Sequence, residues 1–347
     1  MSALLERPPF GPRDDARFIE EMNALTAHHL AWCPPFARVW PGWTPGADAA
    51  SLPYLHAGVF KRGDLTTEFP GVRRGRFLRS SGSGGAVSRI ALDEESSALQ
   101  ARSAAAILAD ALGGGTRPLL VIDRAASLRE RGTLSARTAA ALSLAPLASE
   151  IRFLLDDPGP VGGIAWSRIA DLLEREEEIL VYGFTSILWQ EWAERRRPAD
   201  VAGRLARRKI VFVHSGGWKR LEAQGIDPKT LESRLLATAG PGSRVVDFYG
   251  LVEQIGVPYP LCVSGYRHVP VWADVVVRDA TTLSSLAEET GMLQLVNVLA
   301  RGAPNHSVLT EDLGRIAPGP CPCGREGKRF EMLGRVPRAE LRGCANV

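Results

Sequence analysis

The pattern that most constrains the fold is an alternation of short apolar runs, glycine-rich turns and helical stretches between residues 76 and 250. Pro118–Ile122 follows a run of three glycines, and Lys209–His214 leads directly into the turn Ser-Gly-Gly. Strands and helices that alternate in this way are typical of a mostly parallel sheet covered by helices. We therefore expect an α/β fold.

The pattern also predicts where the elements of this fold lie. The expected strands are Arg76–Ser80, Pro118–Ile122, Ile179–Tyr182, Lys209–His214 and Val245–Tyr249. The expected helices are Asp93–Leu112, Thr138–Leu147, Trp166–Glu178, Ser186–Arg197 and Pro228–Thr238. Asp93 is suited to cap the first of these helices, because its short carboxylate can accept the free N–H groups of the first turn.

Changes of composition divide the chain into four predicted segments. Residues 1–75 are rich in proline and tryptophan and read as a wrapping segment of turns and helix fragments, since prolines 34, 35, 41, 45 and 53 forbid a long helix there. Residues 76–260 form the α/β core. Residues 261–333 change to short strands and turns, which indicates an antiparallel or barrel-like β-rich subdomain. Residues 334–347 are a tail.

Composition excludes several classes of protein. Of 347 residues, 45% are hydrophobic and 23% are charged, which is near the average for a globular protein and argues against whole-chain disorder. The formal net charge of +3 is too small to argue for nucleic acid as a partner. No apolar run approaches the roughly 20 residues of a membrane span, and the start lacks a secretory signal. We expect a cytoplasmic enzyme or binding protein.

A loop of small residues follows the first strand of the core. Arg79–Arg89 reads RSSGSGGAVSR, and its backbone N–H groups and hydroxyls can approach phosphate oxygens while Arg89 adds positive charge. The loop is not a P-loop, because no Gly-Lys-Ser/Thr follows it. Taken alone, such a stretch is more often a linker.

Further motifs follow in a fixed order. They are VHSGGWK at Val213–Lys219, DFYGLVE at Asp247–Glu253, TEDLG at Thr310–Gly314, and Gly334-Arg335. Each is weak alone, but the ordered set resembles the adenylate-forming ligase superfamily. Within it, the loop, the SGGWK turn, the ending CPCGREGKRFEMLGR and the late Cys344 resemble the acyl-protein synthetases known as LuxE. The likeness covers roughly residues 50–347, and phenylacetate–CoA ligases are more distantly similar.

The resemblance implies the adenylate-forming large-domain fold, with ATP and Mg²⁺ as cofactors, and it assigns roles to single residues. The phosphates of ATP would be held by Ser80, Ser81, Gly82, Ser83, Gly84 and Gly85. The nucleoside would be bound by Gly216, Gly217, Trp218, Tyr249, Gly250 and Asp312. Glu253 would contact Mg²⁺, and Arg335 would approach the ribose or the α-phosphate. Read singly, Glu253 is also consistent with a helix-start charge and Asp312 with a turn.

The sequence departs from the superfamily at its end. Gly334-Arg335 usually precedes a mobile domain that carries a catalytic lysine, whereas this sequence ends 13 residues later, at Val347. We therefore expect that domain to be lacking, and Lys219, Arg89 or a tail arginine to supply its charge. Cys344 lies near Arg338 and Arg342, which favour the thiolate, and in the acyl-protein synthetases a cysteine near the C-terminus carries the acyl group. The alternative is a tail cysteine without a role.

Five cysteines, an odd number, argue against a disulfide framework. Cys262, His268, Cys321 and Cys323 offer an acceptable tetrahedral zinc set, although zinc sites more often use two to four residues between cysteines. Buried apolar cysteines in a Pro/Gly loop are the alternative.

These observations predict an ATP-dependent enzyme that activates a carboxylic acid, most simply a fatty acid, as acyl-AMP and loads the acyl group onto Cys344. A downstream reductase, transferase or carrier protein would then accept it. One alternative is a ligase that makes an acyl- or aryl-CoA or acyl-carrier-protein thioester directly. Another is an inactive protein that binds acyl groups or nucleotide. His214 could line the acyl pocket or cap a strand, and Val181–Trp192 could form the pocket wall, although such residues more often belong to a core.

Overall fold

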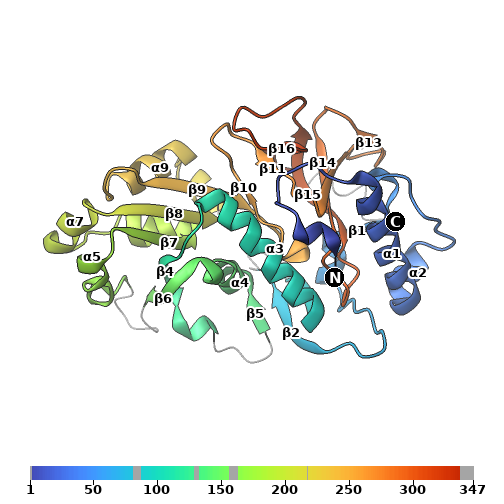
Figure 1. The fold of residues 1–347 in the computed structure, drawn as a ribbon, viewed down its shortest axis with the longest axis horizontal. Helices are drawn as coiled ribbons and strands as arrows, with labels where there is room; N and C mark the ends of the chain where they lie inside the picture. The colour runs from blue at the N-terminus through green and yellow to red at the C-terminus, as the bar shows by residue number, and fades with distance from the viewer. Residues whose placement is uncertain (1, 81–86, 129–132, 156–162, 217, 337–347) are drawn as a thin grey trace. The chain divides into compact units, whose positions relative to one another are not determined.

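The computed structural model describes residues 2–80, 87–128, 133–155, 163–216 and 218–336 (Figure 1). The chain forms two compact units. One, here called the antiparallel unit, combines residues 1–107 with 251–347, and the other, the parallel unit, comprises residues 108–250. The four segments expected from composition are stretches of sequence, and their division into domains stays a prediction.

The parallel unit is built on a sheet in the order β9-β8-β7-β4-β6, in which all neighbours are parallel. Its strands are β4 (Arg117–Arg124), β6 (Ala148–Leu155), β7 (Glu178–Phe184), β8 (Lys209–Ser215) and β9 (Arg244–Tyr249). β5 (Thr133–Ser135) is a short additional strand. The predicted α/β fold with a parallel sheet is confirmed, because the apolar runs between the glycine turns become its inner strands.

Helices cover both faces of this sheet (Figure 1). They are α4 (Ala136–Ser143), α5 (Leu172–Arg175), α6 (Thr185–Leu188), α7 (Ala199–Leu205), α8 (Lys219–Glu222) and α9 (Pro228–Leu236). Successive side chains of a strand point to opposite faces, so Val181 joins one apolar cluster and Tyr182 the other. Both faces are therefore buried, as a parallel sheet requires.

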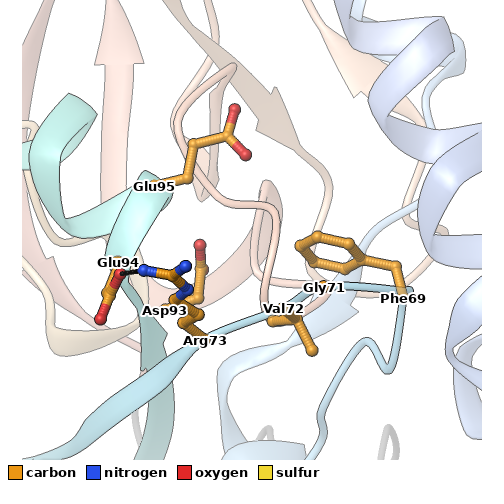
Figure 2. A pocket seen from close by; sticks show the side chains of 7 residues that line it. All are labelled: Phe69, Gly71, Val72, Arg73, Asp93, Glu94 and Glu95. Atoms are coloured by element: carbon orange, nitrogen blue, oxygen red, sulfur yellow. Dashed lines mark ion pairs between the residues drawn. The ribbon is translucent and has the colours of Figure 1, made fainter.

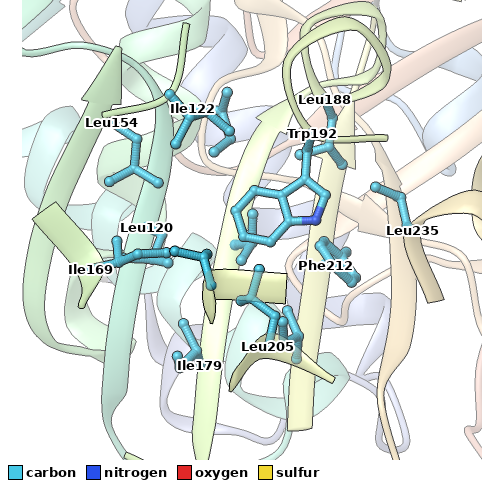
Figure 3. Packing of buried hydrophobic residues seen from close by; sticks show 14 of the residues in the cluster. Leu120, Ile122, Leu154, Ile169, Ile179, Leu188, Trp192, Leu205, Phe212 and Leu235 are labelled. Carbon is cyan, nitrogen blue, oxygen red and sulfur yellow. The ribbon is translucent and has the colours of Figure 1, made fainter. Parts of the chain in front are cut away.

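One of these clusters contains the residues predicted to form an acyl-pocket wall. Trp192 is fully buried and packs edge to face against Phe212 and Trp166, with ring centroids 5.6 and 5.3 Å apart. Figure 3 shows it among aliphatic side chains of the strands and of the helices beside them. Leu188 and Trp192 thus lie in the hydrophobic core of the parallel unit.

The helix predicted over Trp166–Glu178 is wrong. A 3-10 turn at Trp166–Ile169 and the single-turn helix α5 replace it, and β7 already begins at Glu178. Arg152 of β6 explains the break, because its guanidinium bonds the carbonyl of Arg168 at 2.6 Å and both carboxylate oxygens of Asp171 at 2.5 and 2.8 Å. A continuous helix would need that carbonyl for its own hydrogen bond.

The helix predicted over Ser186–Arg197 is also shorter than expected. After α6 the chain forms a π-turn at Trp189–Ala193 and leaves the helix. The guanidinium of Arg197 bonds the carbonyl of Trp192, which closes this end. The other helical predictions are confirmed in position, with the one over Thr138–Leu147 split between α4 and a 3-10 turn.

The antiparallel unit contains the predicted β-rich region. Its main sheet has the order β11-β16-β15-β14-β12-β13, with antiparallel neighbours throughout. The strands are β11 (Arg267–His268), β12 (Ala273–Arg278), β13 (Ser285–Leu286), β14 (Gly291–Asn297), β15 (Ser307–Ile316) and β16 (Arg329–Arg335), and β10 (Tyr259–Pro260) precedes them. The antiparallel arrangement expected after Leu261 is confirmed.

The N-terminal part contributes more than a wrapping segment. α1 (Asp15–Trp32) is a long helix that buries Phe18, Met22 and Leu25, and α2 (Pro34–Val39) follows it. Asp14 caps α1 by accepting the N–H of Arg17 at 3.0 Å. β1 (Leu55–His56) adds a parallel strand to β15. The expectation that residues 1–75 hold no long helix is therefore wrong, because the prolines at 34, 35, 41, 45 and 53 all follow α1 and do not interrupt it.

The glycine-rich loop joins the two strands of a hairpin. β2 (Arg74–Arg79) pairs with β3 (Arg89–Asp93), and α3 (Glu94–Leu112) follows β3 directly. Asp93 caps α3 as predicted, because its Oδ1 accepts the N–H of Ser96 at 2.9 Å. Within the described residues, no helix is long and apolar enough to cross a membrane.

Candidate active site

The mouth of the glycine-rich loop is held by two serines. Ser80 donates its N–H to the carbonyl of Ser88 at 3.1 Å, and its Oγ accepts the N–H of Ser88 at 2.9 Å. Two hydrogen bonds between Ser80 and Ser88 therefore close the β2–β3 hairpin at the point where the loop begins and ends. Ser81, Gly82, Ser83, Gly84 and Gly85, predicted to hold phosphate, lie outside the described residues.

Arg89 stands at the start of β3, just after that loop. Its guanidinium lies 3.2 Å from the carboxylate of Asp64 and 4.7 Å from the centre of the Phe77 ring. A residue predicted to add charge beside phosphate therefore already has an acidic and an aromatic neighbour. Its role at the loop stays a prediction.

Glu253 is a buried carboxylate of the antiparallel unit. It lies in a 3-10 turn at Val252–Gln254 and is 5% exposed. Desolvation raises the pKa of Glu253, Asp312 raises it further by charge repulsion, and Ser88 and Lys61 partly offset both. Buried negative charge beside a second carboxylate is the setting in which a divalent cation bound by oxygen ligands is stabilising. The predicted Mg²⁺ ligand fits that chemistry.

Asp312 and Arg335, predicted to serve the ribose and the α-phosphate, meet across two neighbouring strands. They are directly opposite in the pairing of β15 with β16, and the Nε of Arg335 donates to Oδ1 of Asp312 at 2.7 Å. The Asp312 side chain is 6% exposed and that of Arg335 is 50% exposed. The arrangement presents a fixed carboxylate whose charge is balanced by a solvent-facing guanidinium.

The remaining predicted nucleoside contacts lie where β8 and β9 of the parallel unit end. Gly216 adopts φ +60°, which favours glycine, at the turn after β8, and Trp218 follows it half-buried. Tyr249 is the last residue of β9 and Gly250 comes next. Carboxyl ends of parallel strands share one edge of a sheet, the usual ligand-binding edge in open α/β sheets.

His214 is a buried member of this same edge. Its Nδ1 lies 2.9 Å from the Oγ1 of Thr185, at the start of α6, and 3.6 Å from the carboxylate of Asp247 on β9. The ring of Trp218 stands edge-on to the imidazole at 5.8 Å. The sequence alone leaves His214 open between pocket lining and strand capping. The structure places it beside three side chains, one from α6, one from β9 and one from the turn after β8.

Besides the loop residues, three further predicted residues have no described side chain. Gly217 and Cys344 lie outside the described residues, and Lys219 begins α8 without a described side chain. Their roles rest on the sequence.

The four predicted zinc ligands come together in the antiparallel unit. The ligand atoms of Cys262, His268, Cys321 and Cys323 all lie within 4.8 Å of one another. Cys262 is in the turn before β11, His268 is in β11, and the other two are in the connection from β15 to β16. The sulfur atoms of Cys262 and Cys321 are 3.8 Å apart, and Sγ of Cys323 is 3.3 Å from Nε2 of His268.

A hollow of about 340 Å³ elsewhere in the antiparallel unit contains none of the predicted site residues. Figure 2 shows its lining, in which Arg73 and Glu94 form an ion pair at 3.7 Å. Asp93 caps α3 with one of its carboxylate oxygens. We assign this hollow no role in the reaction.

Sequence reasoning missed one buried polar cluster. His306 is fully buried, stacks on His29 with ring centroids 4.6 Å apart, and bonds the Oγ1 of Thr26 through Nε2 at 3.0 Å. Desolvation and the nearby His28 lower the pKa of His306 to about 3. The cluster fastens α1 to the sheet. No local signal distinguishes such a histidine from a surface one.

The fold and these residues define a class of protein. Two solved structures of 2-hydroxyisobutyryl-CoA ligase are similar, each with 14% identity over 95% of this chain. The open conformation in complex with 2-HIB-AMP and CoA gives a TM-score of 0.64, and this chain covers 77% of that protein's length. The postadenylation state in complex with 2-HIB-AMP gives a TM-score of 0.65, and this chain covers 70% of its length. The fold is therefore the large-domain fold of adenylate-forming ligases.

The sequence narrows the class further. The family model for the acyl-protein synthetase LuxE matches residues 46–347, and this chain belongs to that family. Among curated proteins, none matches the sequence. Family membership supports ATP-dependent activation of an acid by an AMP-forming ligase.

Proposed function

We propose that this chain activates a fatty acid with ATP as an acyl-adenylate and transfers the acyl group to its own Cys344. The thioester would then pass to a partner enzyme, a reductase or a transferase, or to a carrier protein. The observation that carries the proposal is the family match, which extends over every motif from the glycine-rich loop to Cys344. Because the reaction consumes ATP, a cytoplasmic location belongs to the proposal.

In the first step, a carboxylate oxygen of the acid attacks the α-phosphorus of ATP, and the bond to pyrophosphate breaks. The acid and ATP must be held in line, so the chain acts mainly through positioning and charge. Asp312 would accept hydrogen bonds from the ribose hydroxyls, and the adjacent Arg335 would face the α-phosphate. The backbone of Ser80–Gly85 would hold the β- and γ-phosphates.

Mg²⁺ would neutralise the charge that develops on the phosphate oxygens. Glu253 would hold it, and the burial of that carboxylate together with the proximity of Asp312 supports the assignment. Lys219 is the proposed source of further positive charge beside the phosphates. Arg89, already beside Asp64, is the second candidate.

In the second step, the thiolate of Cys344 attacks the carbonyl carbon of the acyl-adenylate. A carbon–sulfur bond forms, the bond from that carbon to the AMP oxygen breaks, and AMP leaves with the electron pair. The thiol proton passes to solvent. Arg338 and Arg342 precede Cys344 in the sequence, and we propose that their charge would favour the thiolate.

Two alternatives lead to different products. The fold is shared with a ligase whose solved structure contains CoA, so an external thiol such as CoA or a carrier protein could replace Cys344 as acceptor. A protein that only binds nucleotide would release no pyrophosphate.

Acid-dependent exchange of labelled pyrophosphate into ATP tests the proposed activation. The full chain is mixed with Mg-ATP and each of a panel of saturated fatty, short hydroxy and aryl acids. We expect exchange with at least one fatty acid and its loss in Glu253→Gln. Absence of exchange with every acid, from a folded protein that binds ATP, would favour the non-catalytic alternative. Exchange with aryl or hydroxy acids alone would overturn the fatty-acid assignment.

A further inference from the structure

We propose that Cys262, His268, Cys321 and Cys323 form a structural zinc site that fastens β16 to β11. This site goes beyond the proposed function, because adenylation needs no zinc. It rests on the geometry of four described side chains in the antiparallel unit.

The spacing of the ligand atoms fits one tetrahedral ion. Two thiolates bound to one zinc, each at about 2.3 Å, lie about 3.8 Å apart, and a thiolate and an imidazole nitrogen lie about 3.6 Å apart. The sulfur atoms of Cys262 and Cys321 are 3.8 Å apart. The Cys323 sulfur and His268 nitrogen, at 3.3 Å, are only a few tenths of an ångström closer. Both pairs already match the edges of such a site.

A disulfide and an iron–sulfur cluster both fit these four side chains less well than zinc does. A disulfide needs sulfur atoms about 2.05 Å apart, and Cys262, Cys321 and Cys323 are all free thiols. A two-iron cluster would spread its ligands over two metal centres, whereas these four atoms all lie within 4.8 Å of one another. Three cysteines with one histidine are an established structural zinc set.

Burial supports a structural rather than a catalytic role. Cys262 and Cys321 are each 7% exposed, His268 is 1% exposed, and Cys323 is half-buried. Four protein ligands complete a tetrahedron and leave no open position for substrate. The ring of Phe10 packs edge-on against His268 at 5.8 Å, so the N-terminal segment covers the site on one side.

The positions of the four ligands in the fold indicate which segments the zinc ion would connect. β11 pairs with the first residues of β16, where His268 is opposite Arg329, but this pairing involves only two residues of β11. The ion would join β11 to the connection that enters β16 and so fix the start of that strand. Six residues further along β16, Arg335 meets Asp312. The zinc site would therefore hold in register the strand that carries Arg335.

The test measures metal in the purified full chain. Protein expressed with added zinc is dialysed, and its metal content is determined by inductively coupled plasma mass spectrometry. The variants are Cys323→Ser, which changes the most exposed ligand, and Cys262→Ser. The matched control is Cys33→Ser, which changes a buried cysteine between α1 and α2. We expect about one zinc per chain in wild type and in the control, and less than a fifth of that in both ligand variants, as four-ligand sites require.

Cobalt gives a second readout that does not depend on the variants folding well. Wild-type protein is stripped with a chelator and refilled with Co²⁺, whose visible band is intense when the ion is tetrahedral and lies between about 600 and 750 nm when several ligands are thiolates. We expect that band, and a melting temperature that falls when the metal is removed and recovers with zinc. Wild type without bound zinc and without the cobalt band would overturn the proposal. So would equal zinc in Cys262→Ser and wild type, or a brown protein with stoichiometric iron.

Discussion

Replacing Asp312 by asparagine should damage catalysis far more than stability. The change removes the carboxylate charge that meets Arg335 at 2.7 Å but keeps the size of the side chain. Arg335 is half-exposed, so water screens the pair, and breaking it should cost about 1 kcal/mol of unfolding free energy or less. The N–H of Asp312 bonds the Oγ1 of Thr310, and this contact remains.

The catalytic effect is larger because the proposed partner of Asp312 is the ribose of ATP. A hydrogen bond to a charged acceptor contributes about 1.5–3 kcal/mol. Loss of about 2–3 kcal/mol from the transition state corresponds to a fall of about 30- to 150-fold in kcat/KM for ATP. The assay is pyrophosphate exchange at varied ATP, and stability is measured by urea unfolding of the same preparations.

Glu331→Gln supplies the matched control on the same two strands. Glu331 of β16 pairs with Arg315 of β15 at the surface, so its loss should leave both stability and exchange nearly unchanged. The reasoning would be refuted if Asp312→Asn kept its kcat/KM for ATP within twofold of wild type. It would also be refuted if the activity loss followed a stability loss of more than about 3 kcal/mol, since that would make Asp312 a structural residue.

Three further predictions concern single side chains. Burial raises the pKa of Glu253, so the ionised carboxylate destabilises the folded state as the pH rises through that pKa. Glu253→Gln should therefore be at least as stable as wild type in urea unfolding at pH 8, but inactive in pyrophosphate exchange. A marked loss of stability in this variant would contradict the prediction. His306 has a pKa of about 3 in the folded state and about 6.5 in the unfolded state, so its neutral form contributes stability that is fully present above pH 6.5. As the pH falls toward 3, about 1.4 kcal/mol of unfolding free energy is lost per pH unit, which is about 2 kcal/mol at pH 5. His306→Gln should flatten that slope by about one proton, and an unchanged slope in urea unfolding would count against it. Lys219→Met should lower the maximal exchange rate at least tenfold with little change in KM for ATP, on the order of one lost charge contact, whereas full activity would shift the role to Arg89.

Strands β4, β7, β8 and β9 of the parallel unit could be predicted because their signal is local, whereas β6, whose residues are mostly half-exposed, was not predicted. Residues 210–213, in the middle of β8, form a run of four apolar residues, as a strand buried on both faces requires, and the glycines after the strand mark its end. The helix predicted over Trp166–Glu178 is wrong, although the sequence pattern there is helical, because the backbone hydrogen bonds of a continuous helix do not form. Arg152, distant in sequence, takes the carbonyl that a helix would use. Such tertiary competition leaves no trace in a local window.

In the candidate site, too, the sequence suggests single residues but not the contacts between residues far apart in the chain. Motif order suggested Asp312 and Arg335 separately, but only the pairing of β15 with β16 brings them into contact. The four predicted zinc ligands were selected for their chemistry although the spacing of Cys321 and Cys323 is unusual, and the structure brings them together from the turn before β11, from β11 and from the connection between β15 and β16. His306 and its partners on α1 were missed, because a buried histidine 280 residues from Thr26 has no sequence signature.

The central claim is that the chain acylates its own Cys344. The most direct test is the intact mass of the full chain after incubation with Mg-ATP and the acid that gives the strongest exchange. Wild type and Cys33→Ser should gain the mass of one acyl group, which hydroxylamine removes, while Cys344→Ser should gain none yet still exchange pyrophosphate. An unmodified wild type that exchanges pyrophosphate and acylates added CoA, or an adduct that persists in Cys344→Ser, would contradict the claim.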